Sequence, residues 1–202
     1  MSQRLIYTMG PSGAGKDSLL AWLKTKLHPH APVHFARRII DRPVQQGGEQ
    51  HESVGAGTFK HLRNHGAFAM HWTANGLQYG VRHTEFDGLW RDQWVMVNGS
   101  RAYLPHALLR FPGMTVLHIT AGAEVLRSRL LARQRETPAM VETRVQRAIA
   151  FQTPPDCRLL EIHNDTSLDA AGLNLLQSLN RLQKWPSTAW DQTRQPTDIT
   201  HT

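Results

Sequence analysis

Short apolar runs and helical patterns alternate along most of this chain. Apolar runs of the length of a β-strand lie at residues 5–9, 33–36, 93–98, 114–119 and 159–164. Segments with the pattern of a helix lie at residues 17–27, 103–111, 125–133, 138–150 and 167–182. This alternation predicts an α/β fold with five core strands.

A different pattern lies between the second and third core strands. Residues 58–65 have the pattern of a short helix, and residues 67–72 resemble a strand. The dipeptide Asn75-Gly76 predicts a hairpin turn into a return strand at residues 77–81. We therefore expect a small lobe that is inserted between two strands of the core.

The C-terminal end of the chain differs in composition from the rest. From residue 184 onward it is polar, contains Pro186 and Pro196, and shows no apolar period. Such segments bury too little apolar surface to offset the entropy of ordering. We therefore expect one folded domain at residues 1–183 and a disordered tail at residues 184–202.

A glycine-rich stretch separates the first predicted strand from the first predicted helix. The residues expected to contact a nucleotide there are Gly10, Pro11, Ser12, Gly13, Ala14, Gly15, Lys16, Asp17 and Ser18. Glycines let the backbone N–H groups turn toward one anion, and the start of the helix adds a positive dipole end. Lys16 stands where a lysine reaches the β- and γ-phosphates. A turn with an incidental lysine would not explain glycine at positions 10, 13 and 15.

Asp17 departs from the usual phosphate-binding loop, which carries Ser or Thr after the lysine to bind Mg²⁺. Ser18 cannot simply replace that hydroxyl, because adjacent helical residues point about 100° apart. Asp17 either binds Mg²⁺ through its oxygens or only favours the helix N-terminus. The third core strand ends in Asn98, without the carboxylate that commonly helps to hold the metal, and this favours Mg²⁺ at Asp17.

Composition and charge narrow the class of ligand. The chain has 202 residues and a formal net charge of +7. Arginine binds phosphate oxygens with two parallel hydrogen bonds, so the charge fits phosphorylated small molecules. There is no basic block interleaved with aromatic residues, so we expect no nucleic-acid partner. No apolar run has transmembrane length and no signal-peptide pattern precedes residue 5, so we expect a cytoplasmic location without a membrane partner.

Arginines and one histidine are candidates for binding the second substrate. Arg37, Arg38 and Arg42 follow the second core strand, where ligand sites of α/β folds gather. They are expected to bind an anionic acceptor; the alternative is a solvated basic loop. His71, inside the lobe, is a further candidate for the acceptor pocket, and its alternative is a purely structural role.

The predicted helices between residues 125 and 150 carry several arginines. Arg133, Arg144 and Arg147 could close over a phosphoryl group in transfer, because arginines stabilise the charge on its equatorial oxygens. Arginine is also a good helix former, so several arginines of this segment are expected to be ordinary surface residues.

Together these features resemble the guanylate kinase family. The resemblance covers residues 4–182 and rests on the glycine-rich loop, Arg42-Pro43, Gly48-Glu49, Phe68 and Tyr79-Gly80. It implies a nucleoside monophosphate kinase-like fold, in which a five-stranded parallel sheet has helices on both faces. It further implies an acceptor-binding lobe at about residues 34–82 and a lid at about residues 127–147. By this resemblance Arg42 and Tyr79 bind the phosphate of the acceptor, and Arg133 and Arg144 belong to the lid.

Three positions depart from guanylate kinase. Met70 stands where that family has the glutamate that reads guanine, and Asp17 and Asn98 are the other two. The Gly-Lys-Asp-Ser loop and the hairpin at residues 74–81 are similar to ribose 1,5-bisphosphate phosphokinases of bacterial phosphonate degradation. That similarity implies ATP as donor, Mg²⁺, and ribose 1,5-bisphosphate as acceptor, with ADP and 5-phosphoribosyl diphosphate as products.

Other functions are left open by the sequence. The first is a nucleoside monophosphate kinase, such as a guanylate kinase. The second is a catalytically inactive binding module, although Lys16 and the three glycines of the loop are all present. A nucleic-acid binder is a third alternative. Whether the chain forms a homodimer is also left open.

Overall fold

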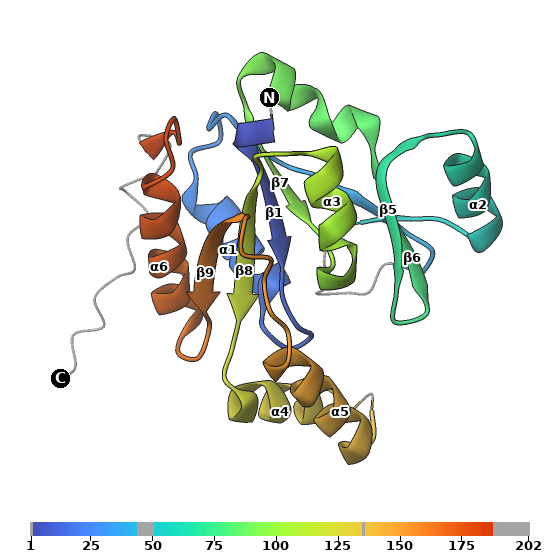
Figure 1. Ribbon diagram of the computed structural model, residues 1–202, viewed down its shortest axis with the longest axis vertical. Helices are drawn as coiled ribbons and strands as arrows, with labels where there is room; N and C mark the ends of the chain where they lie inside the picture. Colours follow the sequence, from blue (N-terminus) through green and yellow to red (C-terminus); the bar gives the residue numbers. More distant parts are fainter. Residues whose placement is uncertain (1, 44–50, 135, 188–202) are drawn as a thin grey trace.

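A five-stranded parallel sheet forms the centre of the molecule (Figure 1). The computed structural model describes residues 2–43, 51–134 and 136–187. The strands of the central sheet are, in spatial order, β2 (Val33–Phe35), β7 (Trp94–Asn98), β1 (Leu5–Met9), β8 (Thr115–Thr120) and β9 (Arg158–His163). All four pairings are parallel. The predicted α/β fold and its five core strands are confirmed.

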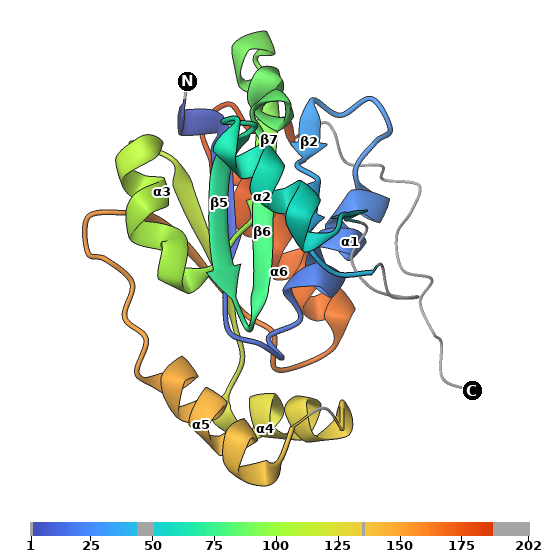
Figure 2. The ribbon, with the colours of Figure 1, turned by 90° about the vertical axis from the view of Figure 1, so that its right-hand side faces the viewer.

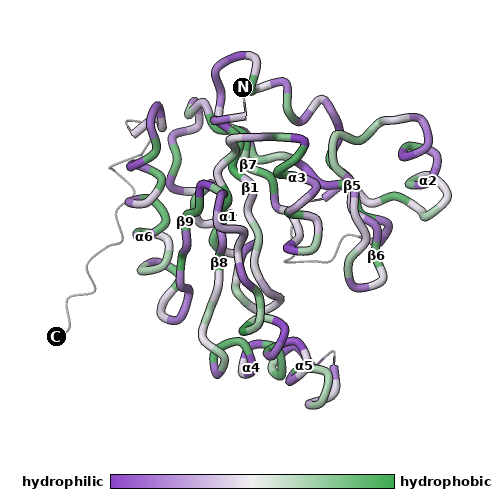
Figure 3. Tube along the Cα trace, viewed as in Figure 1, coloured by the Kyte–Doolittle hydropathy of each residue, from purple (hydrophilic) through white to green (hydrophobic). Residues whose placement is uncertain are grey.

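Helices cover both faces of this sheet, because its inner strands are buried on both sides. The helices of the core and lid are α1 (Lys16–Lys26), α3 (Leu104–Arg110), α4 (Ala123–Ala132), α5 (Pro138–Ile149) and α6 (Leu168–Asn180). One hydrophobic cluster joins Ile6 and Leu117 of the sheet to α1 and α6. A second cluster, on the opposite face, joins Leu5 and Tyr7 to α3 and to the lobe. Hydrophobic and hydrophilic residues both occur along α6, as its one packed face requires (Figure 3).

The inserted lobe has a four-stranded sheet of its own (Figure 2). Its elements are β3 (Arg38–Ile40), β4 (Glu52–Ser53), α2 (Ala56–Asn64), β5 (Phe68–Ala74) and β6 (Leu77–Arg82). The predicted hairpin is present as β5 and β6. The sequence did not predict β3 and β4, because both strands are too short to show a hydrophobic period. They form through pairing: β3 pairs with β6, and β4 pairs with β3. The described residues also form 3₁₀ segments at Ser2–Arg4, His83–Arg91 and Arg101–Tyr103.

The packed domain extends past the predicted boundary at residue 183. Trp185 is only 6% exposed, and its ring meets Trp94 edge-on with centroids 5.1 Å apart. The indole Nε1 of Trp94 donates to the carbonyl oxygen of Lys184 at 2.9 Å. The tail therefore does not begin at residue 184, and residues 188–202 lie outside the described part. Within the described ranges, no helix is long and apolar enough to cross a membrane.

Candidate active site

The glycine-rich loop runs from the carboxyl end of β1 to the first turn of α1. A Cβ atom on Gly10 would lie 1.9 Å from the carbonyl oxygen of Ile119, and one on Gly15 would lie 2.3 Å from Asn164 Nδ2. Gly15 also adopts a φ of 80°, in the left-handed region. No side chain caps α1 at Gly15, so its first N–H groups are available to an anion.

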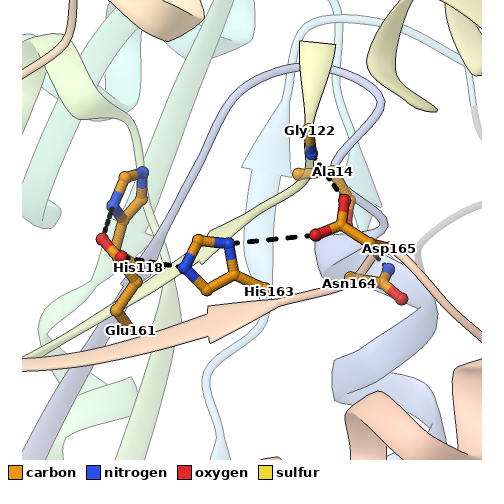
Figure 4. Close-up of polar contacts among 7 residues, drawn as sticks. All are labelled: Ala14, His118, Gly122, Glu161, His163, Asn164 and Asp165. Atoms are coloured by element: carbon orange, nitrogen blue, oxygen red, sulfur yellow. Dashed lines mark hydrogen bonds and ion pairs between the residues drawn. The ribbon is translucent and has the colours of Figure 1, made fainter. Parts of the chain in front are cut away.

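Two residues that follow β9, Asn164 and Asp165, hold the glycine-rich loop and the turn after β8 in place (Figure 4). Asn164 Nδ2 donates to the carbonyl oxygen of Ala14 at 2.8 Å, in a buried bond. Asp165 accepts from the backbone N–H of Gly122 at 2.5 Å. From the lid, Arg129 Nη1 donates to the carbonyl oxygen of Gly13 at 3.4 Å. The loop carbonyls are thus tied to the sheet and to the lid.

Lys16 lies at the centre of the loop, where its Nζ donates to the carbonyl oxygens of Gly10 and Pro11 at 3.0 and 3.1 Å. Burial lowers the pKa of Lys16 to about 8, while the carboxylate of Asp17 raises it and the nearby guanidinium groups of Arg38, Arg101 and Arg133 lower it. Burial thus disfavours the charged form of Lys16 in the free protein, and an anion bound beside it would favour that form.

Asp17 and Asn98 come together in the folded chain. Asn98 Nδ2 donates to Asp17 Oδ1 at 2.6 Å, and the same oxygen lies 4.0 Å from Arg38 Nη2. Within the described part of the chain, the buried Oδ1 of Asn98 has no hydrogen-bond partner. The Asp17 carboxylate lines the cleft next to the loop lysine, and oxygen donors of this kind suit Mg²⁺.

A cleft of about 800 Å³ extends from the loop to the lobe and the lid. Among the described residues that line it are seven cations and one carboxylate, Asp17. The cations are Lys16, Arg38, Arg42, Arg101, Arg133, Arg144 and Arg147. Gly10, Ser12, Gly13, Gly15 and Ser18 of the loop also line it, whereas Pro11 and Ala14 do not. Such an excess of positive charge fits highly anionic ligands.

The lobe contributes one side of the cleft. Arg38 opens β3, and its guanidinium carbon lies 5.2 Å from the centre of the Tyr79 ring. The other stacking partner of Tyr79 is Trp72, with ring centroids 5.5 Å apart and planes 3° from parallel. Arg42 also lines the cleft, and its buried Nε has no hydrogen-bond partner among the described residues. Arg38, Arg42 and Tyr79 thus line one cleft, and their binding of an acceptor stays a prediction.

The segment predicted as a lid, at about residues 127–147, falls within α4 and α5, which lie at the carboxyl end of β8 (Figure 1). Arg144 Nη1 donates to the hydroxyl of Ser12 at 2.9 Å, and the same side chain pairs with Glu136. Arg133 follows α4 and lines the cleft. Arg127 instead forms ion pairs with Glu124 and Glu142 outside the cleft, as expected for a surface arginine.

Two residues that the sequence assigns to the acceptor side, Arg37 and His71, lie outside the cleft. Arg37 is exposed and does not line the cleft; its backbone N–H donates to Glu85. His71 is exposed as well, because alternation along β5 places it on the opposite face from Trp72. Met70 is fully buried in the second hydrophobic cluster and takes no part in lining the cleft.

Arg101 and Trp72 are among the cleft residues that the sequence did not single out. Arg101 follows β7 directly, and the usual position of ligand sites after core strands was the signal that could have found it. Trp72 lies on the strand-like segment of the lobe, and no signal in the sequence separates its role from that of a core tryptophan. Both line the cleft beside predicted residues.

Comparison with known proteins gives the family. No family model matches the sequence. A protein named ribose 1,5-bisphosphate phosphokinase PhnN, from Thiobacillus denitrificans, is 42% identical over 177 residues, which are 88% of this chain and 93% of the relative. The chain belongs to the ribose 1,5-bisphosphate phosphokinase family. A relative of the same name from Chromobacterium violaceum is 45% identical, with coverage of 87% and 92%.

Relatives in this family differ in length. The protein of that name from Laribacter hongkongensis is 44% identical over 92% of this chain, but the match spans only 45% of the relative. The predicted family is thereby confirmed, and this chain corresponds to less than half of some members.

Solved structures show the same fold at low sequence identity. A guanylate kinase from Anaplasma phagocytophilum aligns with a TM-score of 0.58 and 13% identity, over 94% of this chain and 90% of that protein. A protein described as a sugar kinase, from Janibacter sp., aligns with a TM-score of 0.52 and 14% identity, over 93% and 98%. The guanylate kinase-like fold is therefore confirmed, and this likeness concerns the fold alone.

Proposed function

We propose that this chain transfers the γ-phosphoryl group of ATP to the 1-phosphate of ribose 1,5-bisphosphate, forming 5-phosphoribosyl diphosphate and ADP. The observation that carries the proposal is the cleft with seven cations and one carboxylate. ATP and a sugar bisphosphate together bring many negative charges, and this lining can neutralise them.

The acceptor chemistry matches the scarcity of carboxylates. A kinase that phosphorylates a hydroxyl often uses an aspartate to accept its proton. A phosphate acceptor is already ionised, so its oxygen attacks the γ-phosphorus without a base while the bond to the bridging oxygen of ADP breaks. Positioning and charge stabilisation then supply most of the catalysis.

The loop, the lid and the lobe each contribute residues with a defined part in this reaction. Lys16 and the N–H groups at the start of α1 bind the β- and γ-phosphates. Arg133 and Arg144 stabilise the charge on the phosphoryl group in transfer, and the bond from Arg144 to Ser12 already joins the lid to the loop. Arg38, Arg42 and Tyr79 bind the acceptor.

Asp17 would hold Mg²⁺ with the phosphates. Its carboxylate lines the cleft beside Lys16 and fits this ion, which prefers a few protein oxygens and keeps several waters. When bound, Mg²⁺ neutralises phosphate charge and orients the γ-phosphoryl group. The hydrogen bond from Asn98 at 2.6 Å would orient the Asp17 carboxylate for this role.

A coupled ADP-release assay with ATP and Mg²⁺ tests the proposal, with ribose 1,5-bisphosphate and GMP as alternative acceptors. We expect turnover with the sugar bisphosphate. Turnover with GMP alone would instead make the chain a nucleoside monophosphate kinase, the activity for which its Anaplasma structural neighbour is named. Lys16→Ala is the control, because it should abolish turnover while the protein stays folded.

The proposed reaction also bears on the partners, location and oligomeric state of the protein. A small phosphorylated sugar as the only acceptor implies no nucleic-acid partner, and the enzyme would act in the cytoplasm, where ATP is available. Size-exclusion chromatography with light scattering decides between a monomer and a homodimer.

A further inference from the structure

A buried tyrosine is bonded to the backbone that leads into the cleft. Tyr7 lies on β1 and is 0% exposed. Its hydroxyl donates to the carbonyl oxygen of Ser100 at 2.8 Å and accepts from the N–H of Ser100 at 2.9 Å. One side chain thus satisfies both polar groups of one residue, 93 positions away in the sequence, which fixes the backbone there.

The neighbouring residue is shaped to admit this tyrosine. A Cβ atom on Gly99 would lie 2.1 Å from the Tyr7 ring. The N–H of Gly99 donates to the carbonyl oxygen of Thr8 at 2.7 Å, which continues the contact between β7 and β1. Close approach of the ring to the backbone therefore requires glycine at this position.

The residue after Ser100 is Arg101, which lines the cleft. Its guanidinium carbon lies 5.0 Å from the centre of the Phe151 ring, and its Nη1 donates to the carbonyl oxygen of Arg147 at 3.3 Å. Arg101 therefore bridges the end of β7 and the end of the lid helix α5, at the entrance between the loop and the lid.

Arg101 lacks the ion pair that several other arginines of the described residues form. Arg4, Arg82 and Arg127 each pair with a carboxylate. In the ranges that the structure describes, no carboxylate pairs with Arg101. Burial lowers its pKa from the ordinary value, yet a guanidinium remains charged at any working pH. An uncompensated cation beside Lys16 points to a bound anion.

We propose that Arg101 binds a phosphate group of the substrates and that Tyr7 is its positioning residue, acting through Ser100. This inference rests on the function proposed above. The planar guanidinium offers donors beyond the one used by Arg147, and these face substrate phosphates only if the backbone at Ser100 keeps its orientation. Burial raises the pKa of the Tyr7 hydroxyl, so the donor is present throughout the working range of pH.

The test is a double-mutant cycle with Tyr7→Phe and Arg101→Ala. In the ADP-release assay we expect Arg101→Ala to lower kcat/KM by about 100-fold, the scale of a lost charge-stabilising donor. Tyr7→Phe keeps the ring and loses both hydrogen bonds, and we expect roughly a tenfold loss. The double variant should match Arg101→Ala within about twofold, because Tyr7 has nothing left to position.

Matched variants keep this test decisive. Tyr103→Phe removes a hydroxyl in the adjacent 3₁₀ segment and should leave kcat/KM unchanged. If Tyr7→Phe does not fold, Gly99→Ala replaces it in the cycle, since its Cβ would displace the Tyr7 ring. Thermal unfolding of each variant measures the stability that Tyr7→Phe removes. This loss of stability should be the same with Arg101 and with Ala at position 101, whereas the loss of kcat/KM should appear only with Arg101.

Two results would overturn the inference. Full activity of Arg101→Ala would remove its role at the phosphates, and a double variant that loses the product of the two single effects would show that Tyr7 acts independently. A wild-type chain that uses only GMP would refute the proposed acceptor, and the same cycle would then be measured with GMP. If wild-type turnover is absent, the cycle is read in the Kd values of ATP and ribose 1,5-bisphosphate.

Discussion

At the scale of single residues, charge and contact geometry define the cleft more sharply than residue type does. Arg37 and Arg38 are neighbours in the sequence, but only Arg38 is buried beside Tyr79 and Asp17. Asp17 approaches Asn98, 81 positions away. The carboxylate that the third core strand lacks is thus supplied beside that strand's end by the loop.

Replacement of Asp17 tests its metal role. We expect Asp17→Asn to raise the Mg²⁺ concentration for half-maximal rate by at least about 10-fold, because an amide is a weaker ligand than a carboxylate. The free energy of unfolding should change by less than about 1 kcal/mol, since the residue is a surface-facing member of one hydrogen bond. Asp92→Asn, at an exposed ion pair with Arg4, is the matched control. An unaltered Mg²⁺ titration would exclude the metal role.

The pH dependence of ATP binding tests the environment of Lys16. Its pKa of about 8 is below the ordinary 10.5, so the free enzyme loses this proton as the pH rises through 8. Phosphates bind the charged form, hence the affinity for ATP should fall above that pH and binding should take up protons there. Calorimetry in buffers of different ionisation enthalpy measures the uptake. Lys16→Met should abolish it, and uptake that persists in this variant would place the titration elsewhere.

At the scale of elements, the packing of α6 on α1 fixes the helix that begins at the glycine-rich loop. Gly172 of α6 lies so close to Trp22 of α1 that a Cβ atom would approach the indole to 2.5 Å. Trp22 Nε1 also donates to Asp169 at 2.5 Å. Because α1 begins at the loop, a displaced α1 would also displace the first N–H groups that bind phosphate.

Gly172→Ala measures this contact. The added methyl group should destabilise the protein by about 1–3 kcal/mol, because the buried indole must shift. Gly57→Ala in α2 is the matched control, since no atom lies within 4 Å of its added Cβ, and helix propensity there favours alanine by up to about 1 kcal/mol. Urea unfolding of the two variants gives the comparison; equal stability would mean that α1 and α6 adjust freely.

At the scale of the whole molecule, two hydrophobic clusters lie on opposite faces of the central sheet. They hold together the sheet with its helices, the lobe, and the segment formed by α4 and α5. The lobe shares its cluster with β1 and β7, whereas part of the lid shares the other with α1 and α6. The cleft is therefore bounded by elements from separate regions of the sequence, and its positive charge arises only when they assemble.

That assembled charge predicts a dependence on ionic strength. Seven cations and one carboxylate line the cleft, so salt should screen the attraction of both substrates. We expect KM for ribose 1,5-bisphosphate to rise severalfold between about 50 and about 300 mM salt, with a much smaller change in kcat. Steady-state kinetics in KCl measure this, and a KM independent of salt would argue against charge as the main recognition.

The sequence by itself determined the local elements and the family. The five core strands, the hairpin at Asn75-Gly76 and the loop around Lys16 were predictable, because periodicity, turn chemistry and glycine spacing are local properties. The family resemblance rests on the same motifs. These features are encoded over a few adjacent residues and do not depend on how distant segments meet.

Only the tertiary structure decided which side chains share the cleft. β3 exists through its pairing with β6, and that pairing brings Arg38 to Tyr79 while Arg37 stays exposed. Pleating of β5 turns His71 away, and packing against Trp94 extends the domain to Trp185. Long-range contacts decide which side chains face the cleft. A shift of one residue in the pairing of a strand would turn its side chains to the opposite face, although the local sequence pattern would be the same.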